Sequence, residues 1–253
     1  MNKKVIASLA TTAALGAMMV ATTDAHADEM TTNGSISFFE DSKPGTGPFE
    51  GNLKLAYVPE AFDFGNNDIK GVSGSKTYTQ VIDKTKKQYV AVSDDRSTKT
   101  KGWTLNAKVD DFVSTVKDEQ GKETTTTLTS AELAFNVGEN QKYNIDVKAS
   151  DANTPAVPTP AITTEGALTA LPTTDAAYYT NSPATNAKIT LVAAGAEAKI
   201  LNYTSPSQAP AEGTLGVARE VSGVTLNVKD HSNVKDKKFT STVHWVLSED
   251  PTV

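Results

Sequence analysis

Cysteine is absent from the 253 residues of this sequence. Its absence excludes disulfide bonds, thiol nucleophiles and cysteine-ligated metal sites, so the fold has to be stabilised by burial of apolar side chains. A long apolar run is also absent after residue 27. Because a helix needs about 20 mostly apolar residues to cross a bilayer, we expect no membrane insertion of the chain beyond that point.

One apolar run does occur, at the N-terminus. Lys3-Lys4 precedes it, it continues to about Ala21, and Ala25-His26-Ala27 follows as a small-x-small sequence. This order of basic, apolar and small residues is typical of a secretory signal peptide. We therefore expect residues 1–27 to be removed after Ala27 and residues 28–253 to form the mature, secreted protein. The C-terminus lacks the apolar tail and basic residues of a sortase-type anchor, so we expect any attachment to the cell to be non-covalent.

Positive charge is in deficit. The sequence has 30 acidic and 24 basic residues, which gives a formal net charge of −6 with histidine neutral. Such a surface is a poor electrostatic partner for nucleic acid, anionic lipid or teichoic acid. We therefore expect no nucleic-acid partner, and a cell-wall ligand would have to be recognised by shape, hydrogen bonds and aromatic contacts.

Apolar residues recur with a period of two. From Gly102 to Val109 the side chains alternate, with Trp103, Leu105 and Ala107 on the same face as Val109. Many short strands separated by turns predict an all-β fold, a β-sandwich or barrel-like single domain. The alanine-rich stretch 193–199 is the one place where a short helix is expected. Further strands are expected at 35–39, 53–57, 88–93, 128–137, 143–148, 188–192, 224–228 and 239–247.

Residues 149–185 differ from the rest of the chain. Five of the eleven prolines lie there, among many alanines and threonines and few charges. This composition predicts an irregular insertion loop on the β domain. An alternative interpretation is a variable binding loop in which Tyr178-Tyr179 contacts a ligand.

The two tryptophans of the sequence stand in two copies of one pattern, Trp103-Thr104-Leu105 and Trp245-Val246-Leu247. Val58-Pro59, Phe62-Asp63-Phe64-Gly65 and Gly102 accompany the first copy. This arrangement resembles the WxL domain of Gram-positive surface proteins, which carries one such motif in mid-domain and another near its end. The resemblance covers nearly all of residues 28–253.

The resemblance implies a function as well as a fold. Members of this family are associated with non-covalent attachment to the cell wall through peptidoglycan. They are also associated with partner surface proteins, including a membrane-tethered WxL-interacting protein, and some are linked to adhesion to host matrix. The resemblance thus implies a secreted cell-surface protein bound to peptidoglycan, and the alternative function is an adhesin for a host extracellular-matrix protein.

Trp103, Leu105, Trp245 and Leu247 are the candidate residues for contact with the wall or with a partner. Indole rings stack on sugar rings and fill pockets at interfaces, which favours this role. However, tryptophan and leucine two residues apart project to the same side of a strand, and in a sandwich that side is usually the interior. From the sequence, a contact role and a core role both remain open.

We expect no enzymatic activity, cofactor or metal. His231 and His244 are the histidines beyond the signal peptide, and no G-x-S-x-G motif accompanies them. Asn66-Asn67-Asp68 lacks the spacing of a calcium loop. Paired carboxylates of a glycosidase would be the other option, but acidic pairs on an acidic surface are interpreted as solvated charge. Those pairs are Asp94-Asp95, Asp110-Asp111 and Glu249-Asp250.

Overall fold

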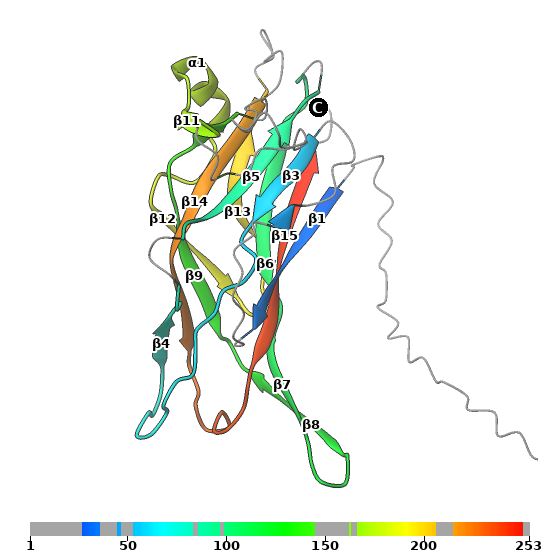
Figure 1. Ribbon diagram of the computed structural model, residues 1–253, viewed down its shortest axis with the longest axis vertical. Coiled ribbons are helices and arrows are strands. Elements are labelled where there is room, and N and C mark those ends of the chain that lie inside the picture. The colour runs from blue at the N-terminus through cyan, green and yellow to red at the C-terminus, as the bar shows by residue number, and fades with distance from the viewer. Residues whose placement is uncertain are drawn as a thin grey trace, which may run out of the picture.

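The computed structural model describes residues 53–82, 86–96, 99–144, 162, 166–205 and 215–249, and the backbone alone of 27–35 and 45–46. These residues form a β-sandwich of two antiparallel sheets packed face to face (Figure 1). The prediction of an all-β fold is confirmed. Within the described part of the chain, no helix has the length and apolar character needed to cross a membrane.

The first sheet has six strands in the order β13-β6-β15-β7-β8, with β1 paired to β15. Strand β15 is its centre, because it pairs with β6, β7 and β1. Every second residue of β6 and of most of β15 is buried, as the period of two predicts. The strands are β1 (Ala27–Ser35), β6 (Trp103–Val109), β7 (Phe112–Lys117), β8 (Glu123–Leu128), β13 (Ala198–Tyr203) and β15 (Thr240–Glu249).

The second sheet has nine strands, and the long strand β14 pairs with four of them, β4, β5, β9 and β10. The register of β14 against β9 shifts between Ser222 and Thr225, where Gly223 adopts φ +59°. The strands are β2 (Gly45–Thr46), β3 (Leu53–Val58), β4 (Lys76–Thr79), β5 (Gln88–Asp94), β9 (Glu132–Val137), β10 (Gln141–Tyr143), β11 (Leu168–Ala170), β12 (Ala187–Val192) and β14 (Leu215–Val228).

Two local expectations from the sequence are wrong. The stretch 193–199 forms no helix but a turn after β12, with Ala194 at φ 52°, followed by β13 from Ala198. Pairing of β13 with β6 and burial of Ile200 and Leu201 outweigh the weak helical preference of alanine. The expected strand 128–137 is interrupted after Leu128 by a turn, and β9 follows. Residues 36–39 and 145–148, part of two other expected strands, lie outside the described residues.

The part of the proline-rich stretch 149–185 that the structure describes, residue 162 and residues 166–185, packs onto the sandwich. It contains β11, a helical turn α1 (Thr173–Ala176) and a 3-10 turn η1 (Ala177–Tyr179). Tyr179 is buried and Tyr178 is half-buried. The alternative interpretation, in which Tyr178-Tyr179 contacts a ligand, is therefore wrong for Tyr179, whose side chain is part of the core.

Residues of both sheets and of η1 enclose one large core, and a second, smaller cluster covers the other face of the nine-stranded sheet. In the smaller cluster the rings of Tyr57 and Tyr143 meet edge to face, with centroids 5.6 Å apart. Ile162 and Ala167 cover them from the outside. This explains why β3 and β5 are buried at consecutive residues, since both of their faces are packed.

Candidate functional site

The two W-x-L motifs lie side by side on neighbouring strands. Strands β6 and β15 are antiparallel, with Leu105 opposite Leu247 and Trp103 opposite Glu249. All four motif side chains belong to the large core and expose 1% or less of their surface. The motif residues thus form the inner face of the centre of the six-stranded sheet.

Trp103 is held at one end of this core by aromatic rings and a carboxylate. Its ring stacks on Tyr203, with centroids 6.0 Å apart and planes at 15°, and it meets Tyr179 edge to face. Its indole Nε1 donates a hydrogen bond of 3.3 Å to Oδ2 of the buried Asp94. The carboxylate of Asp94 therefore helps to fix the position of the motif tryptophan.

Arg96 links Asp94 to the end of β15. Its Nη2 lies 2.7 Å from Asp94 Oδ2 and its Nη1 lies 2.5 Å from Glu249 Oε1, while Lys101 reaches Glu249 Oε2 at 3.2 Å. Burial opposes ionisation of Glu249, but the hydrogen bonds and charges of Lys101 and Arg96 outweigh it, so the pKa of this carboxyl lies below its ordinary value. The carboxylates of Asp94 and Glu249 both pair with the guanidinium of Arg96, which links the end of β5 to the end of β15.

Trp245 is connected to the opposite end of the core by the packing of two further aromatic rings. Its ring centroid lies 5.8 Å from that of Phe135 on β9, and Phe135 stacks on Phe62 at 6.1 Å. Phe62 belongs to the loop that follows β3, and its ring lines a cavity. The C-terminal motif is therefore connected by ring packing to the wall of that cavity.

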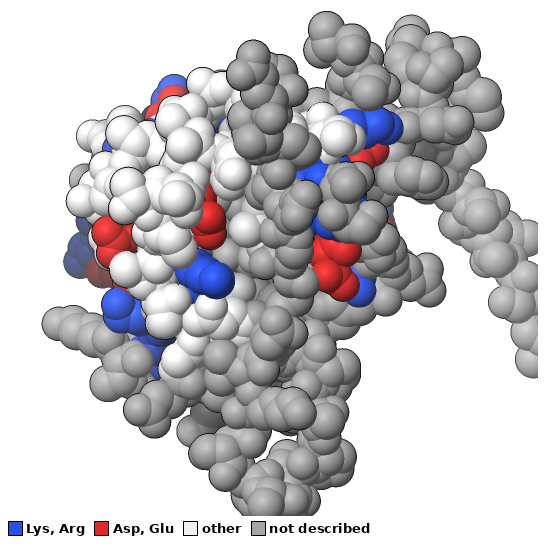
Figure 2. Space-filling model, turned by 90° about the horizontal axis from the view of Figure 1, so that it is seen from above, with Lys and Arg blue, Asp and Glu red and all other residues white. Residues whose placement is uncertain are grey.

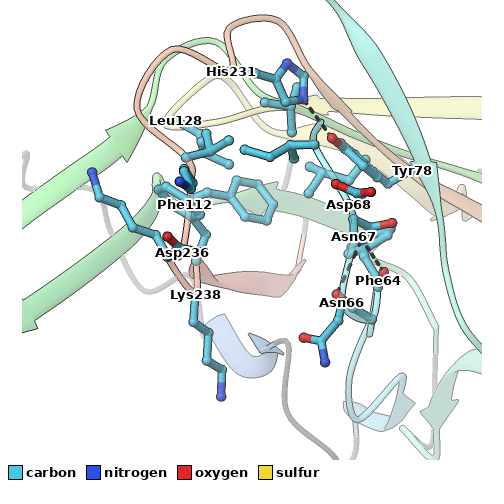
Figure 3. A pocket seen from close by; sticks show the side chains of 18 of the residues that line it. Phe64, Asn66, Asn67, Asp68, Tyr78, Phe112, Leu128, His231, Asp236 and Lys238 are labelled. Carbon is cyan, nitrogen blue, oxygen red and sulfur yellow. Dashed lines mark hydrogen bonds between the residues drawn. The ribbon is translucent and has the colours of Figure 1, made fainter. Parts of the chain in front are cut away.

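The cavity has a volume of about 870 Å³ and lies between the two sheets, beside the start of β7 and the end of β8. Two loops form its opposite sides, residues 62–70 after β3 and residues 231–239 between β14 and β15. Figure 3 shows Asp236 and Lys238 on one side, Asn66, Asn67 and Asp68 on the other, and the ring of Phe112 between them. A volume of this size is in the usual range for a small-molecule or peptide ligand.

The floor of the cavity is apolar and its rim is basic. The apolar lining residues are mostly buried side chains: Phe62, Phe64, Tyr78, Phe112, Leu128, Leu226, Val228 and Phe239. The rim carries four lysines and two aspartates, Lys70, Lys235, Lys237, Lys238, Asp68 and Asp236. Lys237 Nζ bonds to Thr126 Oγ1 and to the carbonyl of Asn233, each at 2.8 Å. Among the described residues none of the four lysines forms an ion pair, so the rim is locally positive.

The histidine in the cavity wall is fully occupied by hydrogen bonds. His231 Nδ1 lies 2.8 Å from the carbonyl of Gly74, which can only accept, and Nε2 lies 2.8 Å from Tyr78 Oη. The neutral ring therefore donates from Nδ1 and accepts at Nε2. His244 lies on the other face of β15, with Nε2 2.8 Å from Asp110 Oδ2. Within the described ranges, no cluster of three or more His, Asp or Glu side chains could hold a metal ion.

The end of the sandwich that carries α1 and β11 has a different surface. Figure 2 shows that its described residues are mostly uncharged there and that basic and acidic side chains are interspersed. No field of one charge sign covers the described part of this face. The uncompensated lysines at the cavity are thus a local feature of an otherwise acidic chain.

The cavity was not predicted from the sequence. Asn66-Asn67-Asp68 was assessed there only for calcium binding and His231 only for catalysis, and both lie in the cavity lining. The available signal was the run Lys235-Asp236-Lys237-Lys238 before Phe239, a local excess of positive charge in an acidic sequence. The phenylalanines that face these lysines are far away in sequence and gave no such signal.

Comparisons with known proteins agree with the motif geometry. The family model described as "WxL domain surface cell wall-binding" matches residues 25–251, which is nearly the whole chain. Searches of curated proteins and of solved structures each found no match. Because the family match spans both β6 and β15 with their motifs, the chain belongs to the WxL family of surface domains that bind the cell wall.

Proposed function

We propose that this protein is secreted, binds peptidoglycan non-covalently and assembles at the Gram-positive cell surface with partner surface proteins. The observation that carries the proposal is the match to the cell-wall-binding WxL family over residues 25–251. The aromatic cavity with its positive rim supports it. The net charge of −6 disfavours binding of wall polyanions over the whole surface, whereas the cavity offers a concave site with locally positive charge.

In this proposal Trp103, Leu105, Trp245 and Leu247 act by supporting the binding surface from inside. Their burial leaves almost none of their surface for direct contact with a ligand. Trp245 packs through Phe135 against the loop of Phe62. The motif would then be required for wall binding because it holds the loops of the cavity in place.

The proposal includes removal of residues 1–27. Strand β1 begins at Ala27, where its backbone pairs with Ser248, so cleavage after Ala27 would leave the strand from Asp28 onward able to pair with β15. Mass spectrometry of the exported protein should therefore give an N-terminus at Asp28. An N-terminus inside residues 29–35 would remove part of β1 and contradict this assignment.

Sedimentation with purified peptidoglycan sacculi tests the function. Sacculi stripped of teichoic acid are mixed with the protein at low and at high salt, and the pelleted fraction is measured. The expected result is pelleting at both salt concentrations, with a smaller fraction at high salt, because apolar contact is only weakly screened whereas pairs of exposed charges are screened. If the protein stays in the supernatant at both, direct wall binding is wrong and a protein partner must hold it at the surface.

A further inference from the structure

We propose that the cavity binds the peptide part of peptidoglycan, with Lys235 and Lys238 pairing with free carboxylates of a stem peptide and the apolar floor receiving its small aliphatic side chains. This inference rests on the proposed function, since it names the part of the wall polymer that is recognised. It also assigns the binding site to two loops, 62–70 and 231–239, neither of which carries a W-x-L motif.

The charge of the rim points to an anionic ligand. Lys70, Lys235 and Lys238 are exposed and have no carboxylate partner among the described residues. Five other described lysines do have one, as in the pairs Lys229–Glu132 at 2.6 Å and Lys117–Glu123 at 2.9 Å. On a chain of net charge −6, a positive rim beside a low-dielectric cavity would concentrate a ligand that carries carboxylates.

The form of the floor favours a peptide over a sugar. Sugar rings stack on exposed aromatic faces, whereas the aromatic rings of this cavity expose less than a tenth of their surface. Leu128, Leu226 and Val228 add an aliphatic wall that suits methyl and methylene groups. At the rim, the amide of Asn66 can both donate to and accept from a peptide group. A short peptide of small apolar residues with free carboxylates fits the apolar floor, the amide of Asn66 and the basic rim.

The position of the two loops on opposite sides of the cavity allows a two-point attachment. Figure 3 shows Lys238 and Asn66 on opposite sides of the cavity, and the ring of Phe112 lies between the loops that carry them. A peptide lying between the loops could thus place a carboxylate on the 231–239 side and a backbone amide on the 62–70 side. Recognition by both loops would make binding dependent on their relative position, and the ring packing of Phe62 on Phe135 fixes the 62–70 side to β9.

The test compares a charge-reversed rim with a matched control. Lys235→Glu/Lys238→Glu changes two exposed side chains of the rim, and Lys188→Glu/Lys199→Glu makes the same change in net charge on exposed residues of β12 and β13 away from the cavity. Folding of each variant is checked by circular dichroism. We expect at least a tenfold weaker affinity for intact sacculi in the rim variant and an unchanged affinity in the control.

Calorimetry and a stem-free polymer identify the recognised part. A synthetic stem pentapeptide should bind the wild-type protein and not the rim variant, and glycan strands freed of stem peptides by an amidase should not pellet it. Equal pelleting of the rim variant and wild type with sacculi would overturn the cavity assignment and leave the proposed function intact. Binding to stem-free glycan strands, no heat with the pentapeptide, or equal heat with an unrelated acidic pentapeptide would each overturn the proposal. Failure of the wild type to pellet with any sacculi would instead contradict the proposed function.

Discussion

The indole ring of Trp245 packs against the phenyl ring of Phe135, with centroids 5.8 Å apart and planes inclined at 44°. The two residues come from different sheets, β15 and β9, so their contact joins the two halves of the sandwich. Trp245 is fully buried, and Phe135 continues the contact to Phe62 at the cavity. The tryptophan of the C-terminal motif therefore contributes both to the stability of the fold and to the geometry of the cavity.

Replacing Trp245 by alanine should destabilise the protein by about 3–5 kcal/mol, because it removes a fully buried ring and leaves a cavity between the sheets. The free energy of unfolding in urea, followed by circular dichroism, measures this loss. Val192→Ala is the control, since Val192 is 43% exposed and its truncation should change stability by only about 0.5 kcal/mol or less. A Trp245→Ala protein as stable as the control would show that the ring is not part of the core.

The strands that could be predicted from the sequence are those with one buried face. Strands β6 and β15 alternate cleanly because their outer faces meet solvent, and this alternation correctly allowed a core role for the motif side chains. Strand β13 was missed, since four consecutive residues of it are buried and an alanine-rich turn precedes it. A strand packed on both sides has no period of two, so its sequence resembles that of other buried segments.

The cavity could not be predicted for a different reason. Phe62, Phe112 and Phe239 come from three separate parts of the chain, and each is an ordinary apolar residue in its own surroundings. Only the topology brings them together. Strand β15 follows all strands of the second sheet in the sequence, yet it pairs with β6 and β7. The lysines of the rim were visible in the sequence, but their lack of acidic partners became visible only with the fold.

The ion pairs at the opposite end of the core predict a pH dependence. Since the pKa of Glu249 is lowered in the folded protein, its stabilising effect is complete above the ordinary glutamate pKa of about 4.3 and is lost as the pH falls through the folded value. Glu249→Gln should therefore cost on the order of 1 kcal/mol at pH 7, and the difference from wild type should shrink between about pH 5 and pH 3.

Thermal or urea unfolding over this pH range checks the prediction, with Glu119→Gln as the control. Glu119 is exposed in the turn between β7 and β8. The control should follow the wild-type curve throughout. A Glu249→Gln deficit that stays constant down to pH 3 would mean that the carboxylate charge does not contribute, and that loss of packing explains the whole effect.

Arg219 predicts a second large effect on stability. Its buried guanidinium donates to three carbonyls, from Nε to Gly138, from Nη1 to Ile200 and from Nη2 to Ala184, at 2.8–3.2 Å. Burial lowers the pKa of the guanidinium to about 10, so the group is still charged at neutral pH. Arg219→Met would leave three carbonyls without this donor and should cost about 3 kcal/mol or more in the free energy of unfolding.

Arg219→Lys distinguishes charge from geometry. An ammonium keeps the charge but lacks the planar fork that reaches three separate carbonyls, so most of the loss should remain. Hydrogen exchange should then rise at amides near Gly138, Ala184 and Ile200, which the guanidinium joins. A lysine variant with wild-type stability would show that a buried positive charge is sufficient and that the three-way hydrogen bonding is dispensable.

Replacing Gly223 by alanine should destabilise the protein, and Gly121 provides a matched control with a similar backbone conformation. Gly223 adopts φ +59° at the register shift of β14, and a Cβ atom there would lie 2.8 Å from Asn136 Nδ2. Gly121, in the turn between β7 and β8, has a similar φ of +79° but nothing within 4 Å of its Cβ position. Gly121→Ala should therefore cost only the backbone strain of about 1–2 kcal/mol, whereas Gly223→Ala should cost more because Asn136 must also move. Equal free energies of unfolding for the two variants would mean that the nearby Asn136 side chain does not contribute to the requirement for glycine.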